Sequence, residues 1–169
     1  MLGRLTELAE CQRALSSAED GAAGVVITGP PGIGKTSLWR AAASSQADGV
    51  VVLRTTGVPA RQRGFVNLAD LFDPVTEAML RALPKPQAEA LGVAFGLSVG
   101  EMPLGEMLLE RAVVAVLRDL AATGVVVAVD DEQWVDDDTR QLIQAAAVRL
   151  FDQSVARTVA RAGADDEKC

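Results

Sequence analysis

The sequence predicts an α/β domain in which a parallel sheet is covered by helices on both faces. Short runs of apolar, β-branched residues alternate with longer segments of helical periodicity along the 169 residues. A glycine-rich loop directly follows the first apolar run, and the strongest apolar run ends in acidic residues. Strands that alternate with helices need right-handed crossovers, so the strands lie parallel and helices cover both faces.

Two helices and two strands are expected near the N-terminus. Apolar residues recur at helical spacing over residues 4–18, and the Ala-rich segment over residues 37–47 also favours a helix. Residues 25–28 and 49–53 are apolar runs typical of buried strands. A loop is expected over residues 55–64, which contain two Gly and one Pro.

The middle of the chain is predicted to be helical with one interruption. Helical periodicity covers residues 66–83, within which Asp73 and Pro74 suggest a fresh helix start with Asp as the N-cap. Pro and Gly residues interrupt residues 84–100, so no regular element is expected there. Residues 104–121 form the best long helix, because apolar side chains follow one face throughout.

The last part of the chain contains the strongest predicted strand. Residues 125–129 are Val except for Ala128, which makes 124–129 a strand, and a helix is expected over residues 138–150. Residues 154–161 fit either a strand or a helix, since Arg157 and Arg161 are unusual in a buried parallel strand. The chain is therefore divided into a core over residues 1–150 and a tail over residues 151–169 that holds a partial last strand or helix.

Composition excludes several classes of function. The net charge of −7 and the absence of a long basic stripe argue against direct nucleic-acid binding by this segment. Two cysteines make no disulfide framework, and no apolar run reaches the length of a membrane span, so we expect a cytoplasmic protein without membrane contact. Because His is absent, proton transfer falls mainly to carboxylates.

The glycine-rich loop carries the clearest chemical pattern. Residues 29–36 match G-x-x-x-x-G-K-[ST] in full, between a predicted strand and a predicted helix. Glycines allow successive backbone N–H groups to face phosphate oxygens, and the helix start adds its positive dipole end. Lys35 would hold the β- and γ-phosphates of ATP, and the Thr36 hydroxyl would bind Mg²⁺. The expected nucleotide contacts are Gly29, Pro31, Gly32, Ile33, Gly34, Lys35, Thr36 and Ser37.

A second acidic site is expected where the strongest strand ends. Asp130 is predicted to bind the magnesium ion, with a water between them. Asp131 is predicted to be catalytic, with Lys35, by orienting or deprotonating the attacking water. Glu132 is a rival for that role, because adjacent side chains of a strand point to opposite faces. Trp134 either packs at the strand–helix junction, which the general burial of Trp favours, or lies near the nucleotide. Residues 136–138 are expected to cap the following helix.

Together these segments resemble the AAA-type ATPases of the signalling class called STAND. Leu2-Gly3-Arg4 with Glu7 is similar to the G-R-x-x-E opening of that class, which implies that Arg4 contacts the nucleotide. Residues 29–36 match its Walker A element, and residues 125–136 resemble its Walker B signature of four apolar residues, D-D, x, Q/H-W, x, D. Residues 65–72 and 83–87 also resemble segments between the two motifs.

The resemblance is strongest to the N-terminal ATPase domain of large LuxR-type transcriptional regulators, over residues 2 to about 150. It implies a three-layer P-loop NTPase fold and a nucleotide switch that binds ATP with Mg²⁺ and hydrolyses it slowly. This chain departs from the family pattern by stopping near the fourth strand, so the C-terminal helical lid and the DNA-binding domain are expected to be absent. Glu132 also stands where the family usually has an apolar residue.

Two other functions remain open at this stage. A small-molecule P-loop kinase would use the same loop, with Arg61 and Arg63 as the one arginine pair available for a lid. A non-catalytic ATP-binding remnant would bind nucleotide without turnover. A neighbouring subunit could supply an arginine to the site, which leaves self-association through the ATPase domains open.

Overall fold

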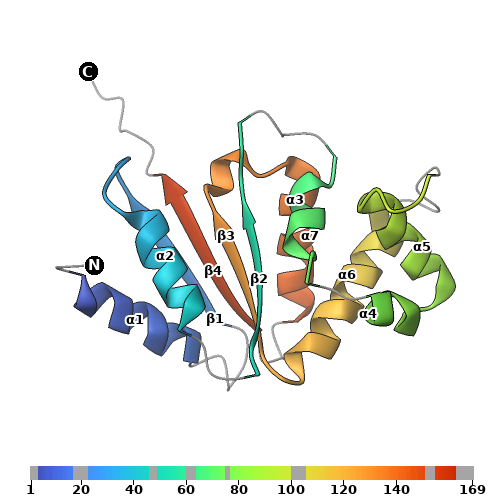
Figure 1. The fold of residues 1–169 in the computed structure, drawn as a ribbon, viewed down its shortest axis with the longest axis horizontal. Helices are drawn as coiled ribbons and strands as arrows, with labels where there is room; N and C mark the ends of the chain where they lie inside the picture. The colour runs from blue at the N-terminus through green and yellow to red at the C-terminus, as the bar shows by residue number, and fades with distance from the viewer. Residues whose placement is uncertain are drawn as a thin grey trace.

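A computed structural model describes residues 4–16, 23–45, 49–59, 64–74, 77–99 and 106–150, together with the backbone of 155–162 (Figure 1). In chain order the elements are α1 (Leu5–Ser16), β1 (Ala23–Gly29), α2 (Lys35–Ser44), β2 (Val51–Thr56), α3 (Val66–Leu71), α4 (Glu77–Ala82), α5 (Lys85–Ala94), α6 (Glu106–Ala121), β3 (Val125–Asp130), the 3₁₀ helix η2 (Glu132–Trp134), α7 (Asp137–Arg149) and β4 (Val155–Ala162). At least one helix separates each pair of successive strands, as the sequence predicts.

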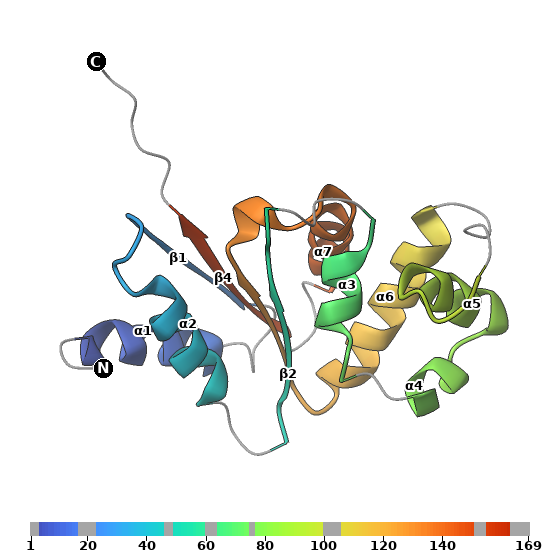
Figure 2. The same cartoon turned by 45° about the horizontal axis from the view of Figure 1, so that its top comes forward.

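The strands form one parallel sheet with the order β1-β4-β3-β2. The turned view in Figure 2 separates α1 and α2 from α3, α6 and α7, which lie on the other side of the sheet. Each side carries its own apolar cluster. The three-layer α/β fold of P-loop NTPases is therefore confirmed.

Strand β3 contributes side chains to the apolar clusters on both sides of the sheet. All six of its residues are buried. Val125, Val127 and Val129 belong to the cluster with α3, α5, α6 and α7, whereas Val126 and Ala128 belong to the cluster with α1 and α2. Because side chains of a strand alternate between faces, a central strand with both faces covered must be apolar at every position.

Helix α5 corrects the expectation that residues 84–100 lack a regular element. Pro84 is the N-cap of α5 and Pro86 lies in its first turn. Proline is tolerated there because the first N–H groups of a helix have no partner within the helix. Ala90 and Leu91 are fully buried, and α5 packs against α6 on the side away from the sheet (Figure 1).

Two other boundaries differ from those expected. Helix α4 begins at Glu77, so Asp73 and Pro74 lie in a turn after α3 and do not cap the next helix. Residues 155–162 form a strand, which is one of the two alternatives for the tail. β4 pairs with β1 on one side and with β3 on the other, and these pairings need extended backbone. The division of the chain at residue 150 stays a prediction.

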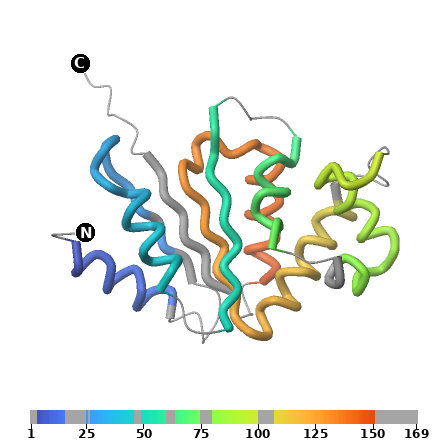
Figure 3. The backbone as a smooth tube through the Cα atoms, in the orientation of Figure 1, coloured from blue at the N-terminus to red at the C-terminus, as the bar shows by residue number. Residues whose placement is uncertain are grey.

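The tube in Figure 3 follows the chain from β1 through the tight loop into α2. This loop lies at the same end of the sheet as the turn that follows β3, because parallel strands end at one edge. The predicted nucleotide and acidic segments therefore share the carboxyl edge of the sheet. Within the described ranges, no helix is long and apolar enough to span a membrane.

Candidate functional site

The loop between β1 and α2 has a backbone that depends on glycine. Gly29, Gly32 and Gly34 have φ angles of 152°, 76° and 90°. L-residues with a side chain rarely adopt these values, whereas glycine does so without steric penalty. Gly34 is the N-cap of α2, and no side chain caps the first turn of this helix. Its N–H groups are therefore left for an anion, which the helix dipole also favours.

Lys35 lies over the loop that precedes it. Its Nζ donates hydrogen bonds to the carbonyl oxygens of Gly29, at 2.8 Å, and Pro30, at 3.0 Å. The residue is 8% exposed. A buried ammonium group needs hydrogen-bond acceptors, and these carbonyls supply them while leaving the charge beside the loop. The Lys35 ammonium group therefore lies next to the loop whose N–H groups would bind the phosphates of a nucleotide.

Thr36 and Asp130 bring the two predicted motifs together. The Thr36 hydroxyl donates to Asp130 Oδ1 at 3.4 Å, across 94 positions of the sequence. Asp130 is the last residue of β3, and Thr36 lies in the first turn of α2. The strand order makes the contact between Thr36 and Asp130 possible, because only β4 lies between β1 and β3 in the sheet.

Asp130 is nearly inaccessible to solvent, with 2% of its surface exposed. Burial raises the pKa of its carboxyl group, and the charge of Asp131 raises it further. Hydrogen bonds from Thr36 and from the Asp131 N–H, at 3.1 Å, oppose this increase, as does the charge of Arg40. A desolvated carboxylate of this kind gains most from a nearby cation.

These residues fit a magnesium ion. Mg²⁺ prefers hard oxygen ligands and is usually held by one or two protein groups, substrate phosphates and waters. Thr36 and Asp130 offer a hydroxyl and a carboxylate oxygen next to the phosphate loop. Among the described residues no cluster of three or more His, Cys, Asp or Glu side chains could hold a metal ion by itself. The donor set is thus the one expected for a metal shared with a nucleotide.

A family model described as the AAA ATPase domain matches residues 1–158. This chain belongs to that family. Its fold is similar to that of Cdc6p from Pyrobaculum aerophilum, with a TM-score of 0.51 and 15% sequence identity. The match covers 96% of this chain and 39% of the other, so the chain spans about two fifths of that protein's length. No curated protein matches the sequence.

The coarse function of this AAA domain follows from membership and geometry together. It is an AAA-type ATPase domain with a nucleotide-binding P-loop. ATP and Mg²⁺ are the ligands that this family binds in general. Lys35 lies over the P-loop, and Thr36 contacts Asp130 at the end of β3.

Asp131 leaves the strand geometry directly after Asp130. Its φ and ψ are both 49°, in the left-handed region that few residues other than Gly adopt. The alternation that keeps neighbouring strand side chains on opposite faces therefore ends at Asp130. Gln133 Nε2 donates to Asp131 Oδ1 at 3.2 Å, which fixes the carboxylate within its own turn.

The turn that follows carries η2 and packs tightly against β2. The N–H groups of Trp134 and Val135 donate to the carbonyls of Asp131 and Glu132, at 2.9 and 3.1 Å. Gly57, just after β2, donates its N–H to the Asp130 carbonyl at 2.9 Å. A Cβ on Gly57 would lie 2.3 Å from the Asp131 carbonyl oxygen, so the two segments touch backbone to backbone.

Trp134 is less buried than a residue packed inside the strand–helix junction would be, and its expected packing there stays a prediction. It is 40% exposed on η2, whereas Val135 next to it is buried. The expected helix cap is confirmed: Asp136 is the N-cap of α7, and its Oδ1 accepts a hydrogen bond from the Thr139 N–H at 2.7 Å.

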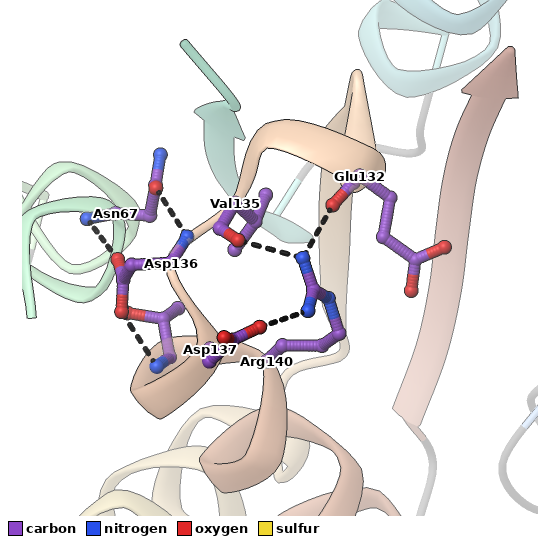
Figure 4. Close-up of polar contacts among 7 residues, drawn as sticks. Asn67, Glu132, Val135, Asp136, Asp137 and Arg140 are labelled. Carbon is purple, nitrogen blue, oxygen red and sulfur yellow. Dashed lines mark hydrogen bonds and ion pairs between the residues drawn. The ribbon is translucent and has the colours of Figure 1, made fainter. Parts of the chain in front are cut away.

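Asn67 forms a reciprocal pair with Asp136 (Figure 4). Its N–H donates to Asp136 Oδ2 at 3.0 Å, and its Oδ1 accepts from the Asp136 N–H at 3.1 Å. Its Nδ2 donates to Thr55 Oγ1 and to the Thr56 carbonyl. Asn67 and Asp136 are both buried, so this network ties α3 and β2 to the start of α7.

Arg140 contacts the same turn from α7. Its Nη2 donates to the carbonyls of Val135, at 2.7 Å, and Glu132, at 3.1 Å, and its Nη1 pairs with Asp137. The Glu132 side chain extends from η2 toward β4 in Figure 4. The choice between Asp131 and Glu132 as the catalytic carboxylate stays a prediction, with Asp131 as the one adjacent to the metal ligand.

The remaining predicted contacts lie around the loop or outside the described residues. Ile33 is exposed at the loop and Ser37 is exposed on α2. Arg4 precedes α1, where its carbonyl accepts from the Leu8 N–H, and its contact with nucleotide stays a prediction. Arg61 and Arg63 lie outside the described residues.

Sequence reasoning missed Asn67, Arg140 and Gly57. Asn67 stands between apolar neighbours in a helix, and a polar residue in such a run is a signal of a buried hydrogen-bond network. Arg140 lies in the first turns of a helix, where the dipole disfavours a cation. The sequence features of Asn67 and Arg140 each indicate a partner elsewhere in the fold, but they do not identify that partner.

Proposed function

We propose that this domain is an ATP-binding switch with slow, magnesium-dependent hydrolysis, and that it serves a cytoplasmic LuxR-type transcriptional regulator. One observation carries the nucleotide part: Thr36 contacts Asp130 at the carboxyl edge of the sheet, with Lys35 over the loop beside an uncapped helix start. Each group suits one part of a magnesium–triphosphate complex.

Binding would use backbone and side chain together. Loop N–H groups contact the phosphate oxygens, and the Lys35 ammonium lies against the β- and γ-phosphates. Thr36 and Asp130 would hold a magnesium ion, and when bound it would offset negative charge on the phosphates. Asp131 accepts a hydrogen bond from the attacking water and orients it. Gln133 holds that carboxylate in place.

The regulator role is supported by the segment from Asp130 to Asp136. This run resembles the extended Walker B signature of the STAND class, and its members have defined places here. Asp130 reaches the P-loop, Gln133 contacts Asp131, and Asp136 caps α7. A turn joined to α3 and α7 in this way can pass a change at the nucleotide to the helical layer. DNA binding is assigned to another domain or chain.

Replacing Lys35 tests the nucleotide site. Lys35→Ala is expected to weaken Mg·ATP binding by about 10- to 100-fold, because charge-assisted hydrogen bonds to phosphate contribute roughly 1.5–3 kcal/mol. Titration calorimetry measures the affinity. Lys85→Ala is the matched control, since Lys85 makes one exposed ion pair with Glu89 on α5. Equal affinity of the Lys35 variant and the wild type would refute the site.

The switch is tested by comparing nucleotide states. Backbone hydrogen exchange of the segment 131–136 is expected to be slower with a slowly hydrolysed ATP analogue and Mg²⁺ than with ADP. A phosphate-release assay without acceptor measures the slow hydrolysis. Rapid phosphoryl transfer to a member of a metabolite panel would show that the domain is a kinase and not a switch. Identical hydrogen exchange in the two nucleotide states would also refute the switch.

A further inference from the structure

We propose that Arg140 and Asn67 are positioning residues that hold the turn 131–136 from two sides and thereby aim the Asp131 carboxylate. The inference rests on the proposed function, in which Asp131 orients the attacking water. Neither residue contacts the P-loop in the structure. Each acts through the backbone of the turn or through Asp136.

The turn requires such support because Asp131 has an unfavourable backbone conformation. Asp131 has a left-handed backbone, which is less favourable for a residue with a Cβ than the right-handed region. Two backbone hydrogen bonds close the turn, from Trp134 to Asp131 and from Val135 to Glu132. A non-glycine residue in this conformation persists where surrounding contacts fix it.

Arg140 supplies one set of these contacts (Figure 4). Its guanidinium spans the carbonyls of Glu132 and Val135, which flank Gln133 and Trp134, while Nη1 pairs with Asp137. A planar guanidinium holds several acceptors in a fixed geometry. The helix dipole opposes a cation near the start of α7, and the i,i+3 pair with Asp137 contributes little to offset this. The contacts of Arg140 instead serve the turn.

Asn67 supplies the other set. It exchanges two hydrogen bonds with Asp136, the residue that ends the turn and caps α7. Its side-chain amide also donates to Thr55 and Thr56 at the end of β2. The far end of the turn is therefore fixed to the sheet edge, while Arg140 fixes its middle.

A purely structural role for Arg140 makes a different prediction from a positioning role. Arg149 lies on the same helix and also makes an ion pair, between its Nε and Glu110 Oε1 at 2.7 Å. Partly exposed pairs of this kind contribute little to folding stability. If the ion pair with Asp137 were the only role of Arg140, Arg140→Ala and Arg149→Ala would behave alike in every assay.

The first measurement separates kcat from nucleotide affinity. Arg140→Ala is expected to lower kcat for ATP hydrolysis by about 10- to 100-fold, since small misplacements of a catalytic group have effects of this size. Its Kd for Mg·ATP should equal that of the wild type, because the P-loop is untouched. Arg149→Ala should match the wild type in both. An unchanged kcat for Arg140→Ala in an active protein would overturn the proposal.

The second measurement needs no turnover and so separates this inference from the proposed function. Trp134 is 40% exposed and Trp39 is 3% exposed, so acrylamide quenching reports mainly on Trp134. Quenching of the nucleotide-free protein should rise in Arg140→Ala and stay unchanged in Arg149→Ala. Unchanged quenching in Arg140→Ala would overturn the proposal, whether or not the protein hydrolyses ATP. An inactive wild type with increased quenching in the variant refutes hydrolysis but supports the fixed turn.

Discussion

Asp130 shows how a single residue can be placed for ligand binding at the expense of stability. Its carboxylate is buried beside Thr36 and accepts from a backbone and a hydroxyl donor, and no cation of the described residues is in hydrogen-bonding contact with it. Burial raises its pKa, so the folded chain holds the proton more tightly than the unfolded chain does. Between the two pKa values the folded state binds more protons, and stability from this group falls as pH rises.

The substitution Asp130→Asn tests whether the charged Asp130 carboxylate lowers folding stability. In EDTA at pH 7 the variant should be at least as stable to urea as the wild type, because it removes a desolvated charge. This advantage should shrink as pH falls through the raised pKa of Asp130, where the wild-type carboxyl becomes neutral. Added Mg·ATP should stabilise the wild type far more than the variant. A variant less stable than the wild type at every pH would contradict the interpretation.

At the scale of elements, the contact between the end of β2 and the turn before α7 determines the shape of the site. It is made by backbone, since a Cβ on Gly57 would lie 2.6 Å from both the Trp134 carbonyl carbon and the Val135 nitrogen. Backbone atoms cannot rotate away as a side chain can. The turn that carries Asp131 is thus shaped by β2 as well as by β3.

Gly57→Ala is expected to destabilise the fold by roughly 1–3 kcal/mol, as overpacking does, and to lower ATP turnover by displacing the turn. Gly92→Ala is the matched control, because Gly92 lies in α5 and its new Cβ would be 3.2 Å from the movable Ser98 hydroxyl. The control should gain about 0.5–1 kcal/mol from helix propensity. Urea unfolding and phosphate release measure both. Equal effects of the two substitutions would contradict the close contact.

For the whole molecule, β4 joins the two halves of the site. It pairs with β1, which leads into the P-loop, and with β3, which ends at Asp130. β1 and β3 are not paired directly, so the strand between them sets their separation. The distance from Thr36 to Asp130 is therefore a property of the complete sheet.

A chain ending at residue 150 should lose cooperative thermal unfolding and ATP binding, because β1 would have no strand to pair with. A chain ending at residue 162 should keep both. Circular dichroism melts and titration calorimetry compare the two lengths. A cooperative, ATP-binding chain of residues 1–150 would show that β4 is dispensable.

The sequence by itself determined the features that depend on neighbours in the chain. The P-loop is one contiguous run between a strand and a helix, and Gly29, Gly32 and Gly34 were needed for backbone angles that the loop then showed. Residues 136–138 were predicted to cap the following helix, and Asp136 does so by accepting from the N–H three residues ahead. Most of the apolar strands followed from local composition in the same way.

Tertiary structure alone decided what depends on distant partners. Residues 155–162 are extended because β1 and β3 both pair with them, although Arg157 and Arg161 made a helix equally plausible. Asn67 meets Asp136 across 69 positions, and no local pattern specifies that pair. Local propensity acts over a few residues, whereas the free energy of hydrogen bonds and burial between distant segments exists only once the sheet has brought them together.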